Sequence, residues 1–541
     1  MSLTKLMSRL PCGVILGSAN VELPFFFMAY NKQKYLHVGS ATDLTGRDRL
    51  LYRAFEILPA LLAWSTLVLV VFLSWKRPVW VAIFIIAFDL YWLIKTVFLA
   101  FHIRASWRHI QHNFSLDWKE RLQSLKWGHL QQLVVLPTAG ESQEIIQETL
   151  LSIEACGWPR DRMIVVLAME DTSADMHTMG DHFLEKYKDA FGIFMVTYHP
   201  QGLAGEMRGK GSNETWAMRE VKKEVDARGI PYENIIASSF DIDTKLYPHF
   251  FYCLAWHFLT AEKPFRSSFQ PVPFYHNNVW DIGAVSRVVA TSGTFWQMMQ
   301  QERPERLTTF SSHSMSFKSL VEVDFWQRNI VSEDSRIFWN HFMYYDGDWS
   351  VVPLSYPVSL DANIAPSVWQ TFKNVYRQQR RWGWGVENVP YVLFGFIKNK
   401  KIPSIKKIKF SFNLIEGFWS WATNALLMFA LGWLPVYLSV REYRTWLILK
   451  NLPYITRNIM VISMFGIITS AVISQAMLRK TREDFHERKR PSFLLHWVLM
   501  PLSIIFFGAF PGLEAQTRLA LGGRFRLGFW LTPKSRKESK N

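Results

Sequence analysis

Five apolar stretches, each close to the length of a bilayer crossing, constrain this chain more than any other feature. The first two run over 57–75 and 79–101 and are separated by the short basic link KRP. Three more run over 417–440, 458–478 and 492–512. An apolar segment of about 20 residues is the sequence signature of a transmembrane helix. The chain is therefore expected to be an integral membrane protein.

The distribution of charge predicts how these segments are oriented. The net charge is +16, and basic clusters at 398–409 and 479–491 flank the third and fourth apolar segments. In a membrane protein such clusters indicate cytoplasmic flanks, and no nucleic-acid partner is expected. A fifth full crossing would export the basic tail. A re-entrant hairpin over 492–512, or one more short crossing within 513–531, would keep the tail inside, which is the arrangement we expect.

Three smaller features of the sequence, namely the N-terminal residues, the cysteines and Asp89, predict no separate function. The first 20 residues are not expected to be a cleaved signal peptide, because their apolar part is short and interrupted by proline and glycine. Cys12, Cys156 and Cys253 are too widely spaced to predict a disulfide framework or a zinc site. Asp89 lies within the second apolar stretch and is expected to pair locally or to meet Lys95.

The block between the two groups of apolar segments resembles a soluble α/β domain. Short apolar runs at 132–137, 163–168, 192–197 and 234–240 alternate with amphipathic stretches such as 143–156 and 213–227. This alternation predicts a mostly parallel sheet flanked by helices and inserted between membrane helices. The predicted parts of the chain are an N-terminal segment 1–54, a transmembrane hairpin 55–102, the α/β domain 103–382, a basic interfacial segment 383–411, a membrane region 412–513 and a basic cytoplasmic tail 514–541.

Two carboxylates directly follow the fourth predicted strand. Asp241 and Asp243 stand two positions apart, so in an extended segment their side chains point the same way. Two carboxylates on one side repel each other unless a cation lies between them, and oxygen ligands of this kind suit Mg²⁺ or Mn²⁺ holding a diphosphate. The alternative is a solvated turn without a metal.

Further polar residues follow the other predicted strands. Glu141 comes after the first strand, and Glu170 and Asp171 come after the second, where open α/β sheets place their ligands. Helix capping by Asp171 or its neighbours is the alternative function for this segment. Lys210 lies between two glycines in RGKGSN, where an ammonium group could approach a phosphate.

Two later segments complete the candidate chemistry. Glu333 and Asp334, in IVSEDSRIFW, could provide a general base or could be first-turn acids of a helix capped by Ser332. In RQQRRWGWG, either Arg380 or Arg381 could hold a diphosphate, and Trp382 and Trp384 could form the wall of a sugar site. A basic, aromatic membrane-surface segment is the alternative for this stretch.

Taken in order, VVLPTAGES, MIVVLAMEDTSAD, GKGSN, DID, SED and QQRRW resemble the motifs of membrane-integrated family-2 glycosyltransferases, which include cellulose, chitin and hyaluronan synthases. The match runs from about 133 to 382, and Q-x-x-R-W is its most specific part. The resemblance implies a GT-A fold, an inverting reaction, a nucleotide-sugar donor that is usually a UDP-sugar, a Mg²⁺ or Mn²⁺ cofactor and a bacterial inner membrane with a cytoplasmic catalytic domain.

The resemblance also implies a role for each matching residue. Asp334 would be the catalytic base, Asp171 would contact the nucleotide base, and Lys210 would lie near the donor. Asp241 would meet the diphosphate, and together with Asp243 it would hold the metal. Gln378 and Arg381 would bind the diphosphate, and Trp382 would stack under the acceptor.

One departure from the family leaves the acceptor open. Ser312, His313 and Ser314 stand where processive relatives have small and thiol residues, so His313 is a candidate acceptor or metal contact, with a buried or simply exposed histidine as the alternative. The expected function is addition of sugars to a growing polysaccharide, with translocation as an added possibility. The alternatives are transfer of one sugar to a lipid and, third, a non-catalytic membrane partner with a degenerate transferase domain.

Overall fold

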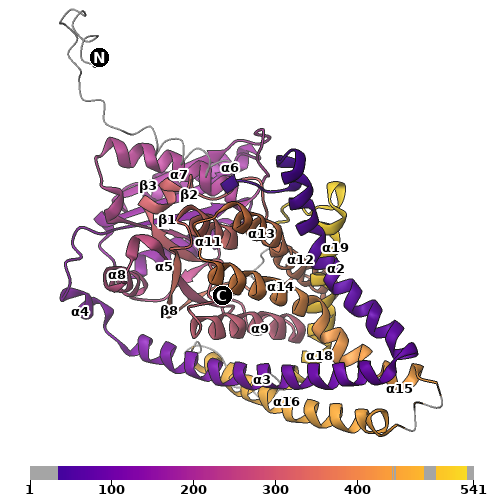
Figure 1. The fold of residues 1–541 in the computed structure, drawn as a ribbon. Helices are drawn as coiled ribbons and strands as arrows, with labels where there is room; N and C mark the ends of the chain where they lie inside the picture. The colour runs from indigo at the N-terminus through magenta and orange to yellow at the C-terminus, as the bar shows by residue number, and fades with distance from the viewer. Residues whose placement is uncertain (1–34, 441–442, 444–445, 481–494, 533–541) are drawn as a thin grey trace, which may run out of the picture.

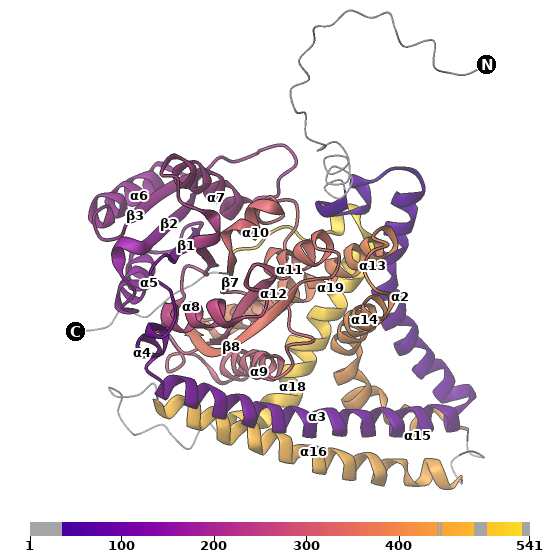
Figure 2. The ribbon, with the colours of Figure 1, turned by 60° about the vertical axis from the view of Figure 1, so that its left-hand side comes forward.

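The computed structural model describes residues 35–440, 443, 446–480 and 495–532. The expectations for the first 20 residues and for Cys12 lie outside this part of the chain, as does nearly all of the basic cluster at 479–491. Figures 1 and 2 show a domain of strands and helices resting on a group of long helices.

The four strands predicted from the sequence form one half of the central sheet. They are β1 (Gln131–Thr138), β2 (Met163–Glu170), β3 (Ile193–His199) and β4 (Ile235–Ser239). Their pairings with one another are all parallel, in the order β3-β2-β1-β4. Because parallel strands end at the same edge, the residues after β1, β2 and β4 meet at one side of the sheet.

The other half of the sheet is mixed and was not predicted from the sequence. The sheet continues from β4 to β7 (His313–Ser316), β6 (Ser267–Phe274), β8 (Ser350–Ser359) and β5 (Lys245–Leu246). Strand β7 is antiparallel to both β4 and β6. This strand is short and polar, so it lacks the apolar run by which strands are found.

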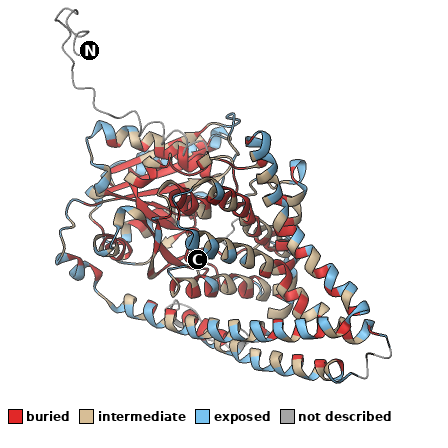
Figure 3. Cartoon of the chain, viewed as in Figure 1, coloured by how far each residue is buried: buried red, intermediate tan, exposed pale blue. Residues whose placement is uncertain are grey.

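Both faces of the parallel half are covered by helices. Alternate residues of the strands enter two different cores: Val134 and Leu167 pack toward α5 (Gln143–Ala155) and α8 (Phe250–Thr260). Their neighbours in the sequence pack toward α7 (Lys210–Ala227) and α11 (Glu333–Tyr344). Strands β2 and β4 are consequently buried along their whole length, and β1 and β3 are mostly buried (Figure 3). The predicted mostly parallel α/β fold is confirmed.

Five helices of the described chain are long and apolar enough to cross a membrane. Three of them are α2 (Gly46–Lys76), α3 (Pro78–Ser115) and α16 (Leu447–Lys480). The fourth begins with α14 (Ser404–Leu426), well before the predicted start at 417. Helix α3 packs along α16 beneath the domain (Figure 2). Many of their large apolar side chains are exposed, as expected for surfaces that face lipid.

The fifth of these helices, His496–Leu521, has its last part in α19 (Phe510–Leu521). Its first residue, His496, lies 2.9 Å from Arg287 of α9 (Ala284–Gln301), and near its end the carbonyl of Leu519 accepts a hydrogen bond from Arg53 of α2. The chain then turns back to the α/β domain. The side of the membrane on which the tail lies stays a prediction.

The expectation that Asp89 meets Lys95 is wrong. Lys95 forms an ion pair with Glu416 of α14 at 2.5 Å, and Glu416 also accepts hydrogen bonds from Tyr91 and Ser420. Asp89 is buried, and its Oδ1 has no hydrogen-bond partner among the described residues. The reason is helical geometry: residues six positions apart lie on different faces of α3, whereas Glu416 approaches Lys95 from another helix.

Candidate active site

One cavity of about 1460 Å³ begins where the parallel strands end and continues between the membrane helices. Its walls come from the end of β2, from the loops after β1 and β4, from α12 (Val368–Gly383), from α3, α14, α16 and the helix His496–Leu521, and from the segment after α19. Of the residues predicted from the sequence, the following line it: Lys210, Asp241, Asp243, Asp334, Gln378, Arg381 and Trp382. Asp171 and His313 do not.

Lys210, the first residue of α7, joins the predicted metal-binding and catalytic segments. Its Nζ donates to Oδ1 of Asp241 at 2.9 Å and to Oδ1 of Asp334 at 2.8 Å. Burial alone would lower the pKa of Lys210, but the carboxylates of Asp241 and Asp334 hold that pKa well above its usual value. Lys210 is therefore a permanent cation that fixes two carboxylates across the cavity.

Two further acids lie behind Lys210, and both are buried. Glu214 accepts a hydrogen bond from Ser239, and its carboxylate lies 3.9 Å from Lys210. Burial raises the pKa of Glu214 and that of Glu333, and the nearby charge of Asp334 raises both further. One oxygen of each has no hydrogen-bond partner among the described residues. Protonated carboxyl groups explain how two acids tolerate this position beside two carboxylates.

Asp334 lies in the first turn of α11 with one oxygen open to the cavity. Oδ1 accepts the hydrogen bond from Lys210, and the backbone carbonyl accepts one from Thr309 at 2.5 Å. Oδ2 has no hydrogen-bond partner among the described residues, and the side chain is 24 % exposed. This arrangement suits a general base, because a fixed carboxylate presents a free oxygen to whatever enters the cavity.

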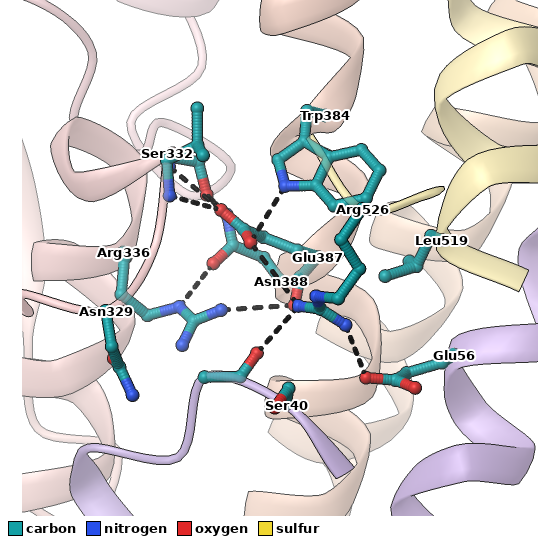
Figure 4. A network of polar contacts seen from close by, with 12 residues as sticks. Ser40, Glu56, Asn329, Ser332, Arg336, Trp384, Glu387, Asn388, Leu519 and Arg526 are labelled. Carbon is teal, nitrogen blue, oxygen red and sulfur yellow. Dashed lines mark hydrogen bonds and ion pairs between the residues drawn. The ribbon is translucent and has the colours of Figure 1, made fainter. Parts of the chain in front are cut away.

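The loop that carries Asp334 is held by Glu387 rather than by a helix cap (Figure 4). Ser332 is the N-cap residue of α11, with Glu333 and Asp334 in the first turn as the alternative predicts, but its side chain makes no capping hydrogen bond. Instead, the hydroxyl and the N–H of Ser332, together with the N–H of Val331, donate to Oε1 of Glu387 at 2.8, 2.9 and 3.0 Å. Glu387 thus binds the two residues immediately before the acidic pair.

The same network reaches α2 and the C-terminal segment (Figure 4). Oε2 of Glu387 accepts a hydrogen bond from Trp384 at 3.0 Å and lies 3.9 Å from Arg526. Arg526 in turn donates to Glu56 of α2 at 2.8 Å. A chain of charges therefore links a membrane helix, the C-terminal segment and the loop of the candidate base.

Helix α12 decides between the alternatives that its sequence left open. Arg381 lines the cavity, whereas Arg380 turns away and pairs with Glu514 at 2.7 Å. Trp382 also lines the cavity, packed near Tyr275 and Phe310. Trp384 is buried against Glu387 and does not line the cavity, so the expectation that both tryptophans form one wall is wrong. Positions 378, 381 and 382 share one face because they are three and four residues apart.

The segment after α19 closes the same cavity, and sequence analysis missed it. Residues 528–532 line the cavity, and the ring of Phe529 lies 5.7 Å from the guanidinium carbon of Arg381. A Cβ at position 209 would lie 3.0 Å from the Phe529 ring, so Gly209 permits this close approach beside Lys210. The available signal was Phe529-Trp530, an aromatic pair within an otherwise basic tail.

At the carboxyl end of β2, the side chain of Glu170 rather than that of Asp171 reaches the cavity. Glu170 is buried, lines the cavity and lies 3.3 Å from Nδ1 of His199. On its other side His199 lies 3.0 Å from Glu206. Burial alone would lower the pKa of His199, but the two glutamates raise it. Asp171 is half exposed and pairs with His177 at 2.9 Å, outside the cavity lining.

His313 lies in the core behind Asp334. Burial lowers its pKa to about 4, so the ring is neutral near pH 7. With Nδ1 3.0 Å from the carbonyl of Phe310 and Nε2 3.2 Å from the Trp326 N–H, the neutral ring donates at Nδ1 and accepts at Nε2. Nδ1 is also 3.8 Å from Asp334. The structure therefore places this candidate acceptor residue beneath the base rather than on the cavity surface.

The predicted cation site consists of two carboxylates that already have hydrogen-bond partners within the protein. Asp241 and Asp243 both line the cavity; Asp241 also accepts from Ser311 at 2.6 Å, and Asp243 accepts from the N–H of Asp361 at 3.0 Å. No group of three or more histidine, cysteine or acidic side chains is arranged for a metal within the described residues. Two carboxylates nevertheless fit Mg²⁺ or Mn²⁺, because such ions commonly take their other ligands from substrate phosphates and water.

The chain is similar to solved structures but matches no known family in sequence. No family model and no curated protein sequence matches the chain. The mannosyltransferase PcManGT from Pyrobaculum calidifontis, in complex with GDP-Man and Mn²⁺, is similar at 14 % identity and a TM-score of 0.37, over 79 % of this chain and 99 % of that chain. TarS 1-349 of S. aureus, in complex with UDP, is similar at 12 % identity and a TM-score of 0.32, over 67 % and 95 %. Likenesses this distant do not assign a reaction.

Proposed function

We propose that this protein is a membrane-bound inverting glycosyltransferase that moves a sugar from a nucleotide-sugar, a UDP-sugar in the first instance, to an acceptor hydroxyl. One observation carries the proposal: the free oxygen of Asp334 shares a single cavity with the carboxylates of Asp241 and Asp243 and with the guanidinium of Arg381. A base, a pair of cation ligands and a diphosphate-binding cation are what this reaction requires.

The geometry suggests a sequence of events at the donor. Arg381 and Gln378 bind the diphosphate, Lys210 holds Asp241 and Asp334 at a fixed separation, and Glu170 or Asp171 contacts the nucleotide base. Asp334 accepts the proton of the acceptor hydroxyl, whose oxygen bonds to the anomeric carbon while the bond to the diphosphate breaks. Mg²⁺ or Mn²⁺ held by Asp241 and Asp243 would supply charge stabilisation for the departing diphosphate. A single displacement of this kind inverts the anomeric centre.

Two kinds of acceptor fit the cavity. Its continuation between the membrane helices is the observation that favours a growing polysaccharide, stacked on Trp382 and passed toward the bilayer. Basic side chains in the same continuation favour a lipid-borne acceptor, as developed below. A ladder of products supports the first, and a single glycolipid supports the second. In both cases we propose a bacterial inner membrane with the catalytic domain on the cytoplasmic side.

The test is sugar transfer by the purified full chain in detergent with Mg²⁺ or Mn²⁺ and a panel of nucleotide-sugars. Wild-type protein should release a nucleoside diphosphate. Asp334→Asn should reduce the rate by at least about 100-fold, because base catalysis contributes factors of about 10² to 10⁴, while donor affinity stays within a few fold. Asp175→Asn is the matched control, since Asp175 is also a first-turn acid but is exposed on α6 (Ala174–Tyr187).

Two outcomes would contradict the proposal. Full activity in Asp334→Asn would remove Asp334 from the role of base. Absence of both donor binding and product formation across the panel would favour the non-catalytic alternative.

A further inference from the structure

Basic side chains gather where the cavity passes from the catalytic centre to the membrane helices. Lys95 comes from α3, and Arg303 and Arg306 come from the loop that follows α9. All three line the cavity together with Phe98 of α3 and Glu416 of α14. None of these residues was singled out by the sequence motifs, and the sugar-transfer step described above does not use them.

Two of the three cations of this cluster have an acidic partner, and Arg306 has none among the described residues. Lys95 pairs with Glu416, and Arg303 pairs with Glu305 at 2.9 Å while its guanidinium carbon lies 5.2 Å from the Phe98 ring. The Arg306 guanidinium makes no hydrogen bond or ion pair with any described residue, and its Nε is buried. Burial and the neighbouring charge of Arg303 lower the pKa of Arg306, while the charges of Glu305 and Glu416 act in the opposite direction without cancelling this effect. A partly buried, unpaired guanidinium is costly, and an anion beside it would remove that cost.

The cluster lies within reach of a molecule bound at the base. Arg306 is three residues before Thr309, whose hydroxyl donates to the carbonyl of Asp334. Three extended residues span at most about 10 Å. An anion held by Arg306 and a hydroxyl held by Asp334 can therefore belong to one acceptor.

The surroundings indicate what else that acceptor contains. Beyond the basic cluster the cavity is bordered by apolar side chains of the membrane helices, including Leu99 of α3 and Met428 and Phe429 from the helix that begins with α14. A cavity with a basic part next to an apolar part suits an amphiphile, whose anionic head would bind the basic side chains and whose apolar chain would contact the membrane helices. Arginine is well suited to a phosphate because its planar donors bind two oxygens together.

We propose that the acceptor is a lipid-linked saccharide whose phosphate is bound by Arg303, Arg306 and Lys95 while its sugar hydroxyl faces Asp334. This proposal rests on the proposed sugar transfer and names its acceptor class. It favours transfer onto a lipid carrier over extension of a neutral free polysaccharide, and it assigns the loop 302–309 a role in acceptor choice.

The experiment compares three acceptors with the purified full chain: a saccharide joined to a long alkyl chain through a phosphate, the same saccharide joined without phosphate, and a water-soluble uronic-acid oligosaccharide. The phosphate-linked acceptor should have a KM at least about tenfold below the others, since one charge-assisted contact of about 1.4 kcal/mol gives that factor. Arg306→Gln should raise this KM about tenfold and abolish the preference, with the donor KM within twofold. Arg306→Lys should restore part of the preference.

Arg219→Gln is the matched control, because Arg219 pairs with Asp324 at 2.9 Å and does not line the cavity. Equal use of the phosphate-free acceptor, or an unchanged acceptor KM in Arg306→Gln, would overturn the acceptor assignment while leaving sugar transfer in place. Preference for the uronic-acid oligosaccharide would replace the lipid phosphate by a carboxylate glycan and also overturn it. Failure to release nucleoside diphosphate with any donor or acceptor would overturn both proposals.

Discussion

At the scale of single residues, the candidate site depends on how many acids one lysine can hold together. Lys210 contacts Asp241 and Asp334 directly, and Glu214 and Glu333 lie behind it. If Glu214 and Glu333 were ionised, they would repel the carboxylates of Asp241 and Asp334. Their raised pKa values favour the neutral form and so limit the negative charge around Lys210. Lys210 binds Oδ1 of Asp334 and so fixes the carboxylate, which leaves Oδ2 available to a ligand in the cavity.

The raised pKa of Glu214 predicts how stability depends on pH. A carboxyl group whose pKa is higher in the folded than in the unfolded state stabilises the fold below its unfolded pKa, near 4.5, and loses this contribution as pH rises through the folded value. The free energy of unfolding should therefore fall from pH 5 toward pH 9, by about 1.4 kcal/mol for each unit of pKa difference. Glu214→Gln should flatten this slope.

Thermal unfolding of wild type and Glu214→Gln in the same detergent, followed from pH 5 to pH 9, measures the effect. Glu220→Gln is the control, because Glu220 lies on the same helix and pairs with Lys223 near the surface. An identical slope in wild type and Glu214→Gln would mean that Glu214 is already ionised at neutral pH.

At the scale of elements, the position of Asp334, the proposed base, depends on α11 and its connection to the helices after α12. Arg336 of α11 donates to Asn388 at 2.6 Å and to the carbonyl of Glu387 at 3.1 Å. Glu387 itself binds the loop before Asp334. The N-terminus of α11 is thus fixed by contacts from the opposite wall of the domain, and not by a cap within its own sequence.

Loss of the Glu387 contacts should affect the chemical step more than donor binding. Glu387→Gln keeps the volume of the side chain but weakens three hydrogen bonds to Val331 and Ser332, so Asp334 should become less well placed. We expect kcat to fall about 10- to 100-fold while the donor KM changes less than about threefold. Steady-state kinetics with varied donor concentration measures both parameters. If kcat and the donor KM changed by similar factors, or if neither changed, Glu387 would not have a positioning role.

At the scale of the whole molecule, the α/β domain and the membrane helices share one site. The cavity is bounded by the sheet, by α12, by four of the membrane helices and by the residues after α19. Arg526 connects Glu56 of α2 to the surroundings of Glu387 just before the chain enters the cavity wall at 528. A change in the packing of α2 is therefore expected to reach the loop before Asp334 through charged side chains.

The ion pair between Glu56 and Arg526 offers a direct measurement of this connection. Arg526→Gln leaves the buried Glu56 with Arg53 as its remaining cation, so it should lower stability by about 1 to 3 kcal/mol. The double variant Glu56→Gln/Arg526→Gln should be more stable than the sum of the two single changes predicts. Thermal unfolding in lipid nanodiscs gives this double-mutant cycle, and strict additivity would show that the two residues are not coupled.

The sequence by itself determined the features that depend on local periodicity and length. Apolar runs of bilayer length predicted the membrane helices, and short buried runs predicted β1 to β4, because hydrophobic pattern records which faces are covered. The mixed half of the sheet was not predicted, since β7 is four mostly polar residues buried by their neighbours. The acidic pair after β4, Asp334 and the Q-x-x-R-W face were found because their spacing is local.

Only the tertiary structure decided which of these residues share one space. It separated Arg381 from Arg380 and Trp382 from Trp384, and it brought Glu170 rather than Asp171 to the cavity. It also placed Phe529, Glu387 and Arg306 around the base, although they lie 195, 53 and 28 positions from Asp334 in the sequence. No local pattern encodes such distances, because they result from how the sheet and the membrane helices pack together.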